Sequence, residues 1–493
     1  MPSATYSHAR YKDCPDKRLA GNYSAVMSYI PCYFTIIQSL LQCAAVEKQS
    51  FLWSNIVDKI IIGSRPYSRQ CLMFLKGNIM PLKIVLVHLD ATNIGDVIIY
   101  DTSKYILGKA LDDIPGLQYE IIPMSIGFQG APQGSTSLVK KFYHLPARAI
   151  RDLMKKVSKI SPRPESLQKS FIRIWHKTGT YKYYIQHEKS KLRGADCIIF
   201  GGGGLIKFHR QSFHFFIDDI TAYADAHDIP VLLCSQGIEG YDKRSAECLL
   251  LKNALNRGCV QFISTRDDIR SLREDYVIDR RITTKLVCDP AFWLNEAYGL
   301  ENPSGAVHMP DNCSSRLIGL NVIRPDIFGE YMHEIDPDEL AKLYRDIIKL
   351  LHDKGYNVRL FSNGVAEDNA FAEKLLSEYP NLESEYGVTI AAPKDPMQLI
   401  ATLKGFERFL AARLHAAITG SVLGIPNASL VWNRKQLLFG RQTGTEDAFI
   451  TEDSFNAAHI VDVLLSAKSY HTDPEYKATC LTSLACELAK LFG

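Results

Sequence analysis

The chain has 493 residues, about three times the length of a typical domain, so we expect two or more domains. Apolar residues make up 46% of the chain and charged residues 23%, which is ordinary for a soluble globular enzyme. The 12 cysteines are scattered without a C-x-x-C pair. This argues against a disulfide framework or a zinc site and favours a reducing compartment.

The net charge is only +3, but it is unevenly distributed. Residues 140–193 hold 15 Lys or Arg and 3 Asp or Glu, a balance of 15 − 3 = +12, so the remainder carries 3 − 12 = −9. Within this basic segment Ile150, Leu153 and Val157 fall on one face of a predicted helix. Such a helix can contact an anionic membrane surface, or it can pack its apolar side on the domain. We expect no nucleic-acid partner.

Residues 1–79 show no clear alternation of strands and helices, and we predict an N-terminal extension there. Its apolar window, residues 24–46, is interrupted by Pro31 and several polar residues, so it does not have the pattern of a membrane span. Met80 lies immediately before the first clear strand. We therefore expect the extension to be dispensable for folding.

From residue 80 onward, short apolar runs with the composition of buried parallel strands alternate with helical stretches. A break rich in Pro, Asn and Ser at residues 301–315 separates two such series. The predicted strands are 83–89, 119–122, 197–200, 231–234, 260–264 and 285–288 before the break, and 317–322, 358–362, 388–391, 408–411 and 428–431 after it. The main helices predicted in the second series are 337–354 and 367–379.

This order predicts an α/β fold with two Rossmann-like domains that face a central cleft. We assign residues 80–300 to an N-terminal domain with a basic insertion at 140–193. Residues 316–440 form the C-terminal domain, and 441–493 a helical tail. Because ligands in such folds bind beyond the carboxyl ends of the strands, candidate site residues should directly follow strands.

Two candidate motifs follow strands of the first series. Asn93, Gly95 and Asp96 open a predicted helix, where a capping Asn and free N–H groups favour an anion or sugar hydroxyls. A simple strand–turn–helix with a capping Asn is the alternative. Gly201 to Gly204 follow the strand at 197–200, where glycines allow the backbone to approach a ligand, or form a flexible turn. The dinucleotide fingerprint is absent, because position 206 is Ile.

Two further motifs contain basic side chains. Arg266 follows the strand at 260–264 and suits a carboxylate or phosphate, or a plain salt bridge, while Asp267 can cap the next helix. Arg413 and His415, on either side of Leu414, lie at a strand-to-helix turn. The arginine supplies a permanent positive charge, and the histidine a proton donor with a pKa near neutrality. A buried histidine beside a capped helix is the alternative. The Asp289-Pro290-Ala291 turn has a more structural than chemical pattern.

In this order, these segments resemble the polysaccharide pyruvyl transferase family over about residues 83–440. The resemblance rests on the segments 93–96, 201–205, 264–271, 289–291, 413–415 and 424–426. It departs from the family at 235–240, where a glycine-proline is often found. The resemblance implies a GT-B-like fold, similar to that of two-domain glycosyltransferases. It also implies phosphoenolpyruvate as donor, bound by Arg413, Leu414 and His415, with Arg266 as a weaker assignment.

The acceptor implied by the resemblance is a sugar of a surface polysaccharide or its lipid-linked precursor. We place it on the N-terminal domain, near Asn93, Gly95 and Asp96 and near Gly202, Gly203 and Gly204. The reaction would release phosphate and form a pyruvate ketal, with Arg413 and His415 as catalytic residues. His415 would act as general acid or as hydrogen-bond partner of the phosphate.

No metal or cofactor is required by this reading, because arginines and helix dipoles can neutralise the leaving phosphate. It implies a cytoplasmic enzyme, with peripheral contact at the inner face of the membrane through residues 140–193 as an option. Two alternatives stay open: a GT-B glycosyltransferase that uses a nucleotide sugar, and a non-enzymatic sugar- or lipid-binding component of a polysaccharide assembly complex.

Overall fold

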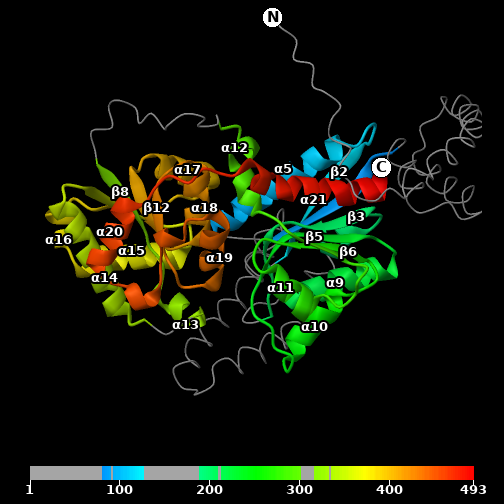
Figure 1. Ribbon diagram of the computed structural model, residues 1–493, viewed down its shortest axis with the longest axis horizontal. Helices are drawn as coiled ribbons and strands as arrows, with labels where there is room; N and C mark the ends of the chain where they lie inside the picture. Colours follow the sequence, from blue (N-terminus) through cyan, green and yellow to red (C-terminus); the bar gives the residue numbers. More distant parts are fainter. Residues whose placement is uncertain (1–79, 90–92, 127–187, 209–212, 301–315, 332–334) are drawn as a thin grey trace, which may run out of the picture. The chain divides into compact units, whose positions relative to one another are not determined.

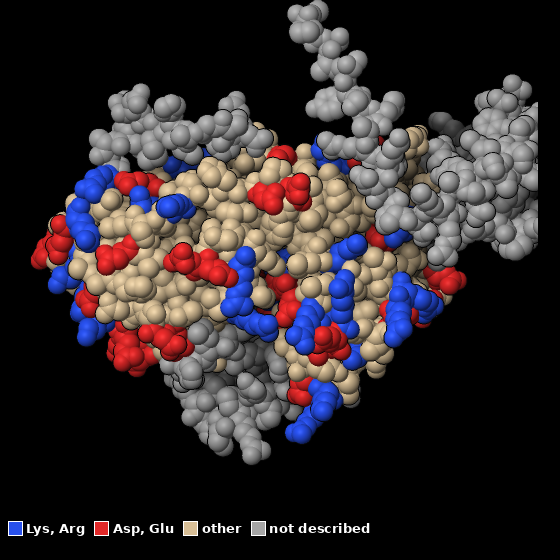
Figure 2. Space-filling view, in the orientation of Figure 1, with Lys and Arg blue, Asp and Glu red and all other residues tan. Residues whose placement is uncertain are grey.

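The computed structural model describes residues 80–89, 93–126, 188–208, 213–300, 316–331 and 335–493 (Figure 1). The predicted N-terminal extension, most of the basic segment 140–193 and the break at 301–315 lie outside the described residues. On the face drawn in Figure 2, basic and acidic side chains of the described residues are interspersed. None of the described helices is long and apolar enough to cross a membrane.

The first sheet is entirely parallel, with the strand order β2-β1-β3-β5-β6-β7, and β4 pairs with β5. Its central strands are buried on both faces, which explains why they are nearly continuous apolar runs. The strands are β1 (Leu82–Leu89), β2 (Tyr119–Ile126), β3 (Cys197–Phe200), β4 (Gly203–Ile206), β5 (Val231–Ile238), β6 (Val260–Thr265) and β7 (Thr283–Leu286).

The second sheet is also parallel, with the order β10-β9-β8-β11-β12-β13. In both sheets the order reverses next to the first strand of the series, which creates the switch point where such folds bind ligands. The strands are β8 (Leu317–Asn321), β9 (Asn357–Phe361), β10 (Thr389–Ala391), β11 (Arg408–Ala411), β12 (Asn427–Leu430) and β13 (Phe449–Ile450).

Helices connect the strands, and a 3₁₀ turn, η3 (Pro290–Trp293), follows β7. The helices are α5 (Ile94–Asp112), α9 (Phe213–Ala226), α10 (Ala246–Leu255), α11 (Ile269–Ser271), α12 (Leu294–Ala297), α13 (Phe328–Tyr331), α14 (Pro337–Asp353), α15 (Ala366–Glu378), α16 (Asn381–Ser384), α17 (Pro396–Lys404), α18 (Leu414–Val422), α19 (Arg434–Thr443), α20 (Ala457–Ser466) and α21 (Pro474–Phe492).

The last helix, α21, packs against elements of the first sheet layer (Figure 1). It contacts α5, β5 and η3, and Leu484 and Leu488 join the same buried apolar cluster as β1 and α5. The Cys480 thiol lies 3.1 Å from the Cys288 thiol, which anchors α21 beside the end of the first series. The segment after residue 440 is therefore more than the predicted helical tail, since it also contributes β13 to the second sheet.

The prediction of an α/β fold with two Rossmann-like parallel sheets is confirmed. Every predicted strand exists, although β7 begins two residues before the predicted 285 and lies at an exposed sheet edge. The alternative of a flexible turn is wrong for Gly203 and Gly204, because both belong to β4 and pair beside β5. Sequence alone missed this strand because glycines have low strand propensity.

Candidate functional site

The N-terminus of α5 meets the carboxyl ends of the second sheet. Asn93 caps the helix as predicted, since its side-chain oxygen accepts a hydrogen bond of 3.1 Å from the Gly95 N–H. The Ile94 N–H donates to the Asn363 carbonyl, just beyond β9, at 2.9 Å. A Cβ atom on Gly95 would lie 2.5 Å from the Cβ of His415, so this position requires glycine. The Asn93 motif and the His415 turn are therefore in direct contact.

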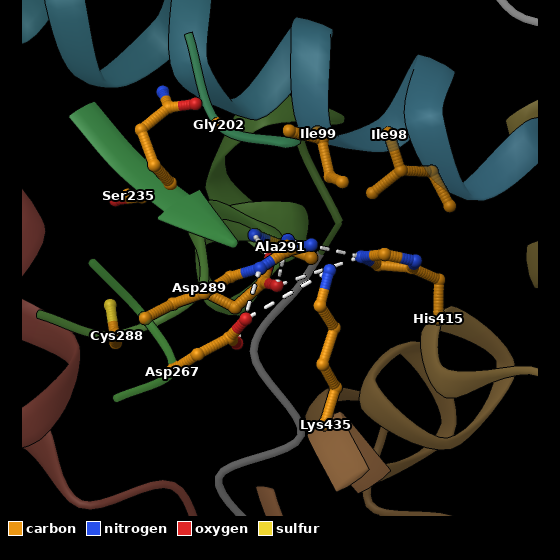
Figure 3. A network of polar contacts seen from close by, with 12 residues as sticks. Ile98, Ile99, Gly202, Ser235, Asp267, Cys288, Asp289, Ala291, His415 and Lys435 are labelled. Carbon is orange, nitrogen blue, oxygen red and sulfur yellow. Dashed lines mark hydrogen bonds and ion pairs between the residues drawn. The ribbon is translucent and has the colours of Figure 1, made fainter. Parts of the chain in front are cut away.

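Arg266 and His415 share one carboxylate, that of Asp289. Figure 3 shows His415 and Asp289 within the same network of polar contacts. The Arg266 guanidinium is ion-paired with Asp289, and its Nη1 lies 3.3 Å from the His415 Nε2. The same Nε2 lies 3.5 Å from Oδ2 of Asp289, whose other oxygen accepts from the Ala291 N–H at 2.9 Å. Burial alone would raise the pKa of Asp289, but Arg266 and His415 hold it well below its usual range.

The turn after β6 differs in one detail from the prediction. Asp268, rather than Asp267, caps α11, because its carboxylate accepts from the Arg270 and Ser271 N–H groups. Asp267 instead accepts from the Ile238 N–H at 2.9 Å and faces the ammonium group of Lys435 at 3.9 Å. The Asp289 turn, expected to be mainly structural, supplies the carboxylate that holds Arg266 and His415.

Lys435, on α19, brings a third cation that the sequence did not reveal. Its ammonium group lies 2.7 Å from one oxygen of Glu239, and Lys207 lies 2.8 Å from the other oxygen. A Cβ atom on Gly204 or on Gly237 would lie 3.0 Å from Nζ of Lys435, so these two glycines leave space for it. Burial works to raise the pKa of Glu239, but the two lysines outweigh it and lower the pKa to about 2.

Arg413 is the N-cap residue of α18, and its backbone N–H donates to the Asn321 side chain at 2.9 Å. Its guanidinium makes a bidentate pair with Asp368 on α15, with two N–H···O bonds of 2.9 Å. Asp368 is fully buried and also accepts from the Arg324 N–H at 3.0 Å. Leu414 packs on the apolar cluster beneath the site. Asp368 therefore fixes the direction in which Arg413 points.

Among the predicted acceptor residues, the glycines have identifiable structural neighbours. A Cβ atom on Gly202 would lie 2.7 Å from Pro290 and 2.9 Å from Ile99, and the Gly202 N–H donates to Ser103 at 3.1 Å. Gly203 has a φ of +148°, which favours glycine. Thus Gly202 keeps α5 close to the Asp289 turn, and Gly204 leaves space for Lys435. An acceptor-binding role for them stays a prediction.

The structure thus brings Gly95, His415 and Arg266 into one network, with Gly204 beside its lysine. Arg413 belongs to the same region, because its positive charge interacts electrostatically with Asp96. Glu239 could have been found, since it directly follows β5 and obeys the rule that site residues follow strands. Lys435 lies farther from the end of its preceding strand, β12, so the rule that site residues directly follow strands did not select it.

A protein-family model described as polysaccharide pyruvyl transferase matches residues 93–434 of the chain. The chain belongs to the polysaccharide pyruvyl transferase family. This identifies it as a transferase, and the matched region begins at Asn93, includes every site residue predicted above, and ends directly before Lys435.

Similar solved structures are distant in sequence. UDP-GlcNAc 2-epimerase from Methanocaldococcus jannaschii has 11% identity and a TM-score of 0.48, covering 83% of this chain and 100% of that one. The UDP-GlcNAc 2-epimerase from Neisseria meningitidis bound to UDP-GlcNAc has 11% identity and a TM-score of 0.47, covering 83% and 99%. No curated protein matches the chain significantly.

Proposed function

We propose that this protein transfers the enolpyruvyl group of phosphoenolpyruvate to a sugar of a surface polysaccharide or its lipid-linked precursor. The products are a pyruvate ketal and inorganic phosphate. Membership of the pyruvyl transferase family supports the reaction class. We further propose a cytoplasmic location, with membrane contact through residues 140–193.

The observation that carries the proposal is the gathering of four basic side chains around the start of α5. Arg266, Arg413, His415 and Lys435 all act electrostatically on Asp96, although they come from three different segments of the chain. Phosphoenolpyruvate carries a carboxylate and a phosphate, and guanidinium groups bind both through paired hydrogen bonds. Two arginines, a lysine and a histidine are a suitable complement for such a donor.

The chemistry requires a proton on the methylene carbon of the donor, which makes C2 electrophilic. A sugar hydroxyl then adds to C2, phosphate leaves, and a second hydroxyl closes the ketal. His415 serves as the general acid or as the hydrogen-bond partner of the phosphate, and Arg266 and Arg413 hold the anionic groups. The acceptor lies on the side of Asn93, Gly95 and Gly202.

A thermal-shift titration tests the proposal. A ligand that binds only the native state raises the apparent melting temperature by mass action. We expect phosphoenolpyruvate to stabilise the wild type and uridine diphosphate to have no effect. Replacement of Arg413 by Ala should abolish the shift, whereas replacement of the exposed Arg270 should not. Stabilisation by uridine diphosphate alone would contradict the proposal and favour a nucleotide-sugar glycosyltransferase.

A further inference from the structure

Asp96 is an acidic residue in the first turn of α5 with no structural task among the described residues. Its side chain is partly exposed, and it makes no hydrogen bond or ion pair with any residue that the structure describes. A carboxylate at the third helical position often closes a capping box by accepting from the N–H of the cap residue. Asp96 makes no such bond to Asn93, so helix capping does not account for it.

The surroundings of Asp96 are rich in cations that are already balanced by other carboxylates. Asp289 pairs with Arg266, Asp368 with Arg413, and Glu239 with Lys435. Among the described carboxylates around these cations, Asp96 is therefore left without a partner of its own. Burial raises the pKa of Asp96, although His415, Arg266, Arg413 and Lys435 work to lower it.

The ring of His415 is held by polar contacts at one nitrogen atom and by close packing at the other. Nε2 faces Arg266 at 3.3 Å and Asp289 at 3.5 Å. Nδ1 lies against Gly95, where an added Cβ would be only 3.0 Å away. The His415 side chain is 10% exposed. His415 is thus fixed as part of the network that holds the cations, whereas the adjacent Asp96 is more open.

A bound phosphoenolpyruvate would change the charge balance at Asp96. The donor brings a carboxylate and a phosphate close to a site whose cations are already paired. Like charges nearby disfavour an ionised carboxylate, so the bound donor favours the neutral acid. Protein surroundings can keep a carboxylic acid neutral at pH 7, where it acts as a proton donor.

We propose that Asp96, as a neutral carboxylic acid, donates the proton that the methylene carbon of phosphoenolpyruvate receives. This proposal rests on the proposed function and makes it more specific. With Asp96 as the proton donor, His415 is left as the hydrogen-bond partner of the phosphate. Asp96 is then a catalytic residue at the junction between the donor and the acceptor.

The reaction begins with proton transfer from Asp96 to the donor. The O–H bond of Asp96 breaks as the C3–H bond forms, and C2 becomes an oxocarbenium centre. The first sugar hydroxyl adds to C2, and its proton returns to the Asp96 carboxylate. The C2–O bond to phosphate breaks, and phosphate leaves with the electron pair. The second hydroxyl adds to C2, and its proton leaves with the phosphate as hydrogen phosphate. No oxidant or reductant is needed.

The experiment compares phosphoenolpyruvate binding to the wild type and to Asp96→Asn by calorimetry between pH 6 and pH 9. The ligand and the neighbouring charged groups His415, Arg266, Arg413 and Lys435 are common to both proteins, so their contribution largely cancels in the ratio of the two Kd values. If Asp96 is neutral in the complex, wild-type binding weakens relative to the variant as pH rises. The loss approaches about tenfold per pH unit above the pKa of the free protein.

Two further variants sharpen the result. Asp101→Asn changes a carboxylate on the same helix that accepts from the Tyr298 hydroxyl at 2.6 Å, and it should bind like the wild type at every pH. Asp96→Glu keeps a carboxyl group and should retain the pH dependence. With methyl glycosides as acceptor probes, Asp96→Asn should lower phosphate release ~10²–10⁴-fold, while binding is kept.

Each outcome decides the matter. A Kd ratio that stays flat from pH 6 to pH 9, together with wild-type turnover in Asp96→Asn, would overturn the role of Asp96, as would wild-type binding that strengthens relative to the variant as pH rises. The same conclusion follows if folded Asp96→Asn turns over like the wild type or cannot bind phosphoenolpyruvate. A wild type that does not bind phosphoenolpyruvate would instead overturn the proposed function.

Discussion

Replacement of Glu239 by Gln should destabilise the protein at neutral pH and have a much smaller effect in acid. Glu239 holds Lys207 and Lys435, and its side chain is 16% exposed. Its pKa falls from an ordinary value of 4.5 to about 2, because the two ammonium groups outweigh the effect of burial. At ~1.4 kcal/mol per pKa unit, this corresponds to about 3 kcal/mol of stability at pH 7.

The sign of the pH dependence follows from the lowered pKa. The stabilisation is complete above the ordinary pKa of 4.5 and is lost as pH falls towards about 2. Urea unfolding of the wild type and Glu239→Gln should therefore differ most at pH 7, differ less at pH 3, and converge only as pH falls to about 2 and below. Glu274→Gln is the matched control, because Glu274 pairs with Arg270 on the exposed surface, where ion pairs contribute only ~0–1 kcal/mol. An equal difference at pH 3 and pH 7 would refute the reasoning.

Three other predictions concern the site and the cysteines. His415→Ala should lower phosphate release ~10²–10⁴-fold with an unchanged circular dichroism spectrum, and wild-type turnover in the folded variant would contradict its role. Gly95→Ala should cost about 1–3 kcal/mol in urea unfolding, because its Cβ would meet His415 at 2.5 Å. Gly108→Ala on the same helix meets only Tyr119 at 3.7 Å, so it should be neutral or stabilising, and equal costs would count against the steric argument. Finally, Cys486 is exposed, so Cys486→Ser should remove one equivalent of fast reaction with an aromatic disulfide reagent, and an unchanged fast phase would show that this thiol is covered.

The alternation of strands and helices was predictable because parallel strands are buried on both faces. Runs such as Cys197–Phe200 and Arg408–Ala411 are apolar and bounded by polar turns, so their limits agree with the structure. The rule that ligands bind beyond the strand ends also selected Arg266 and His415, which the fold brings into contact from positions 149 residues apart.

The cation that each carboxylate of the site binds could not be predicted in the same way. Asp289 and Asp368 are common residues at turns and helix starts, and only the tertiary structure shows which arginine each one binds. Lys435 lies on a helix, so neither strand ends nor glycine motifs pointed to it. Its contacts depend on Glu239 and on the space at Gly204, which no local sequence pattern reports.

The position of α21 affects how the protein can fold during its synthesis. The helix covers α5 and η3, yet it follows the entire second sheet in the chain. Roughly 190 residues separate Leu286 from Pro474, which at ~5–20 residues per second takes about 10–40 s to translate. During that interval the apolar surface that will contact Leu484 and Leu488 stays uncovered on the nascent chain. This surface is therefore where chaperones that recognise apolar segments would bind while translation continues.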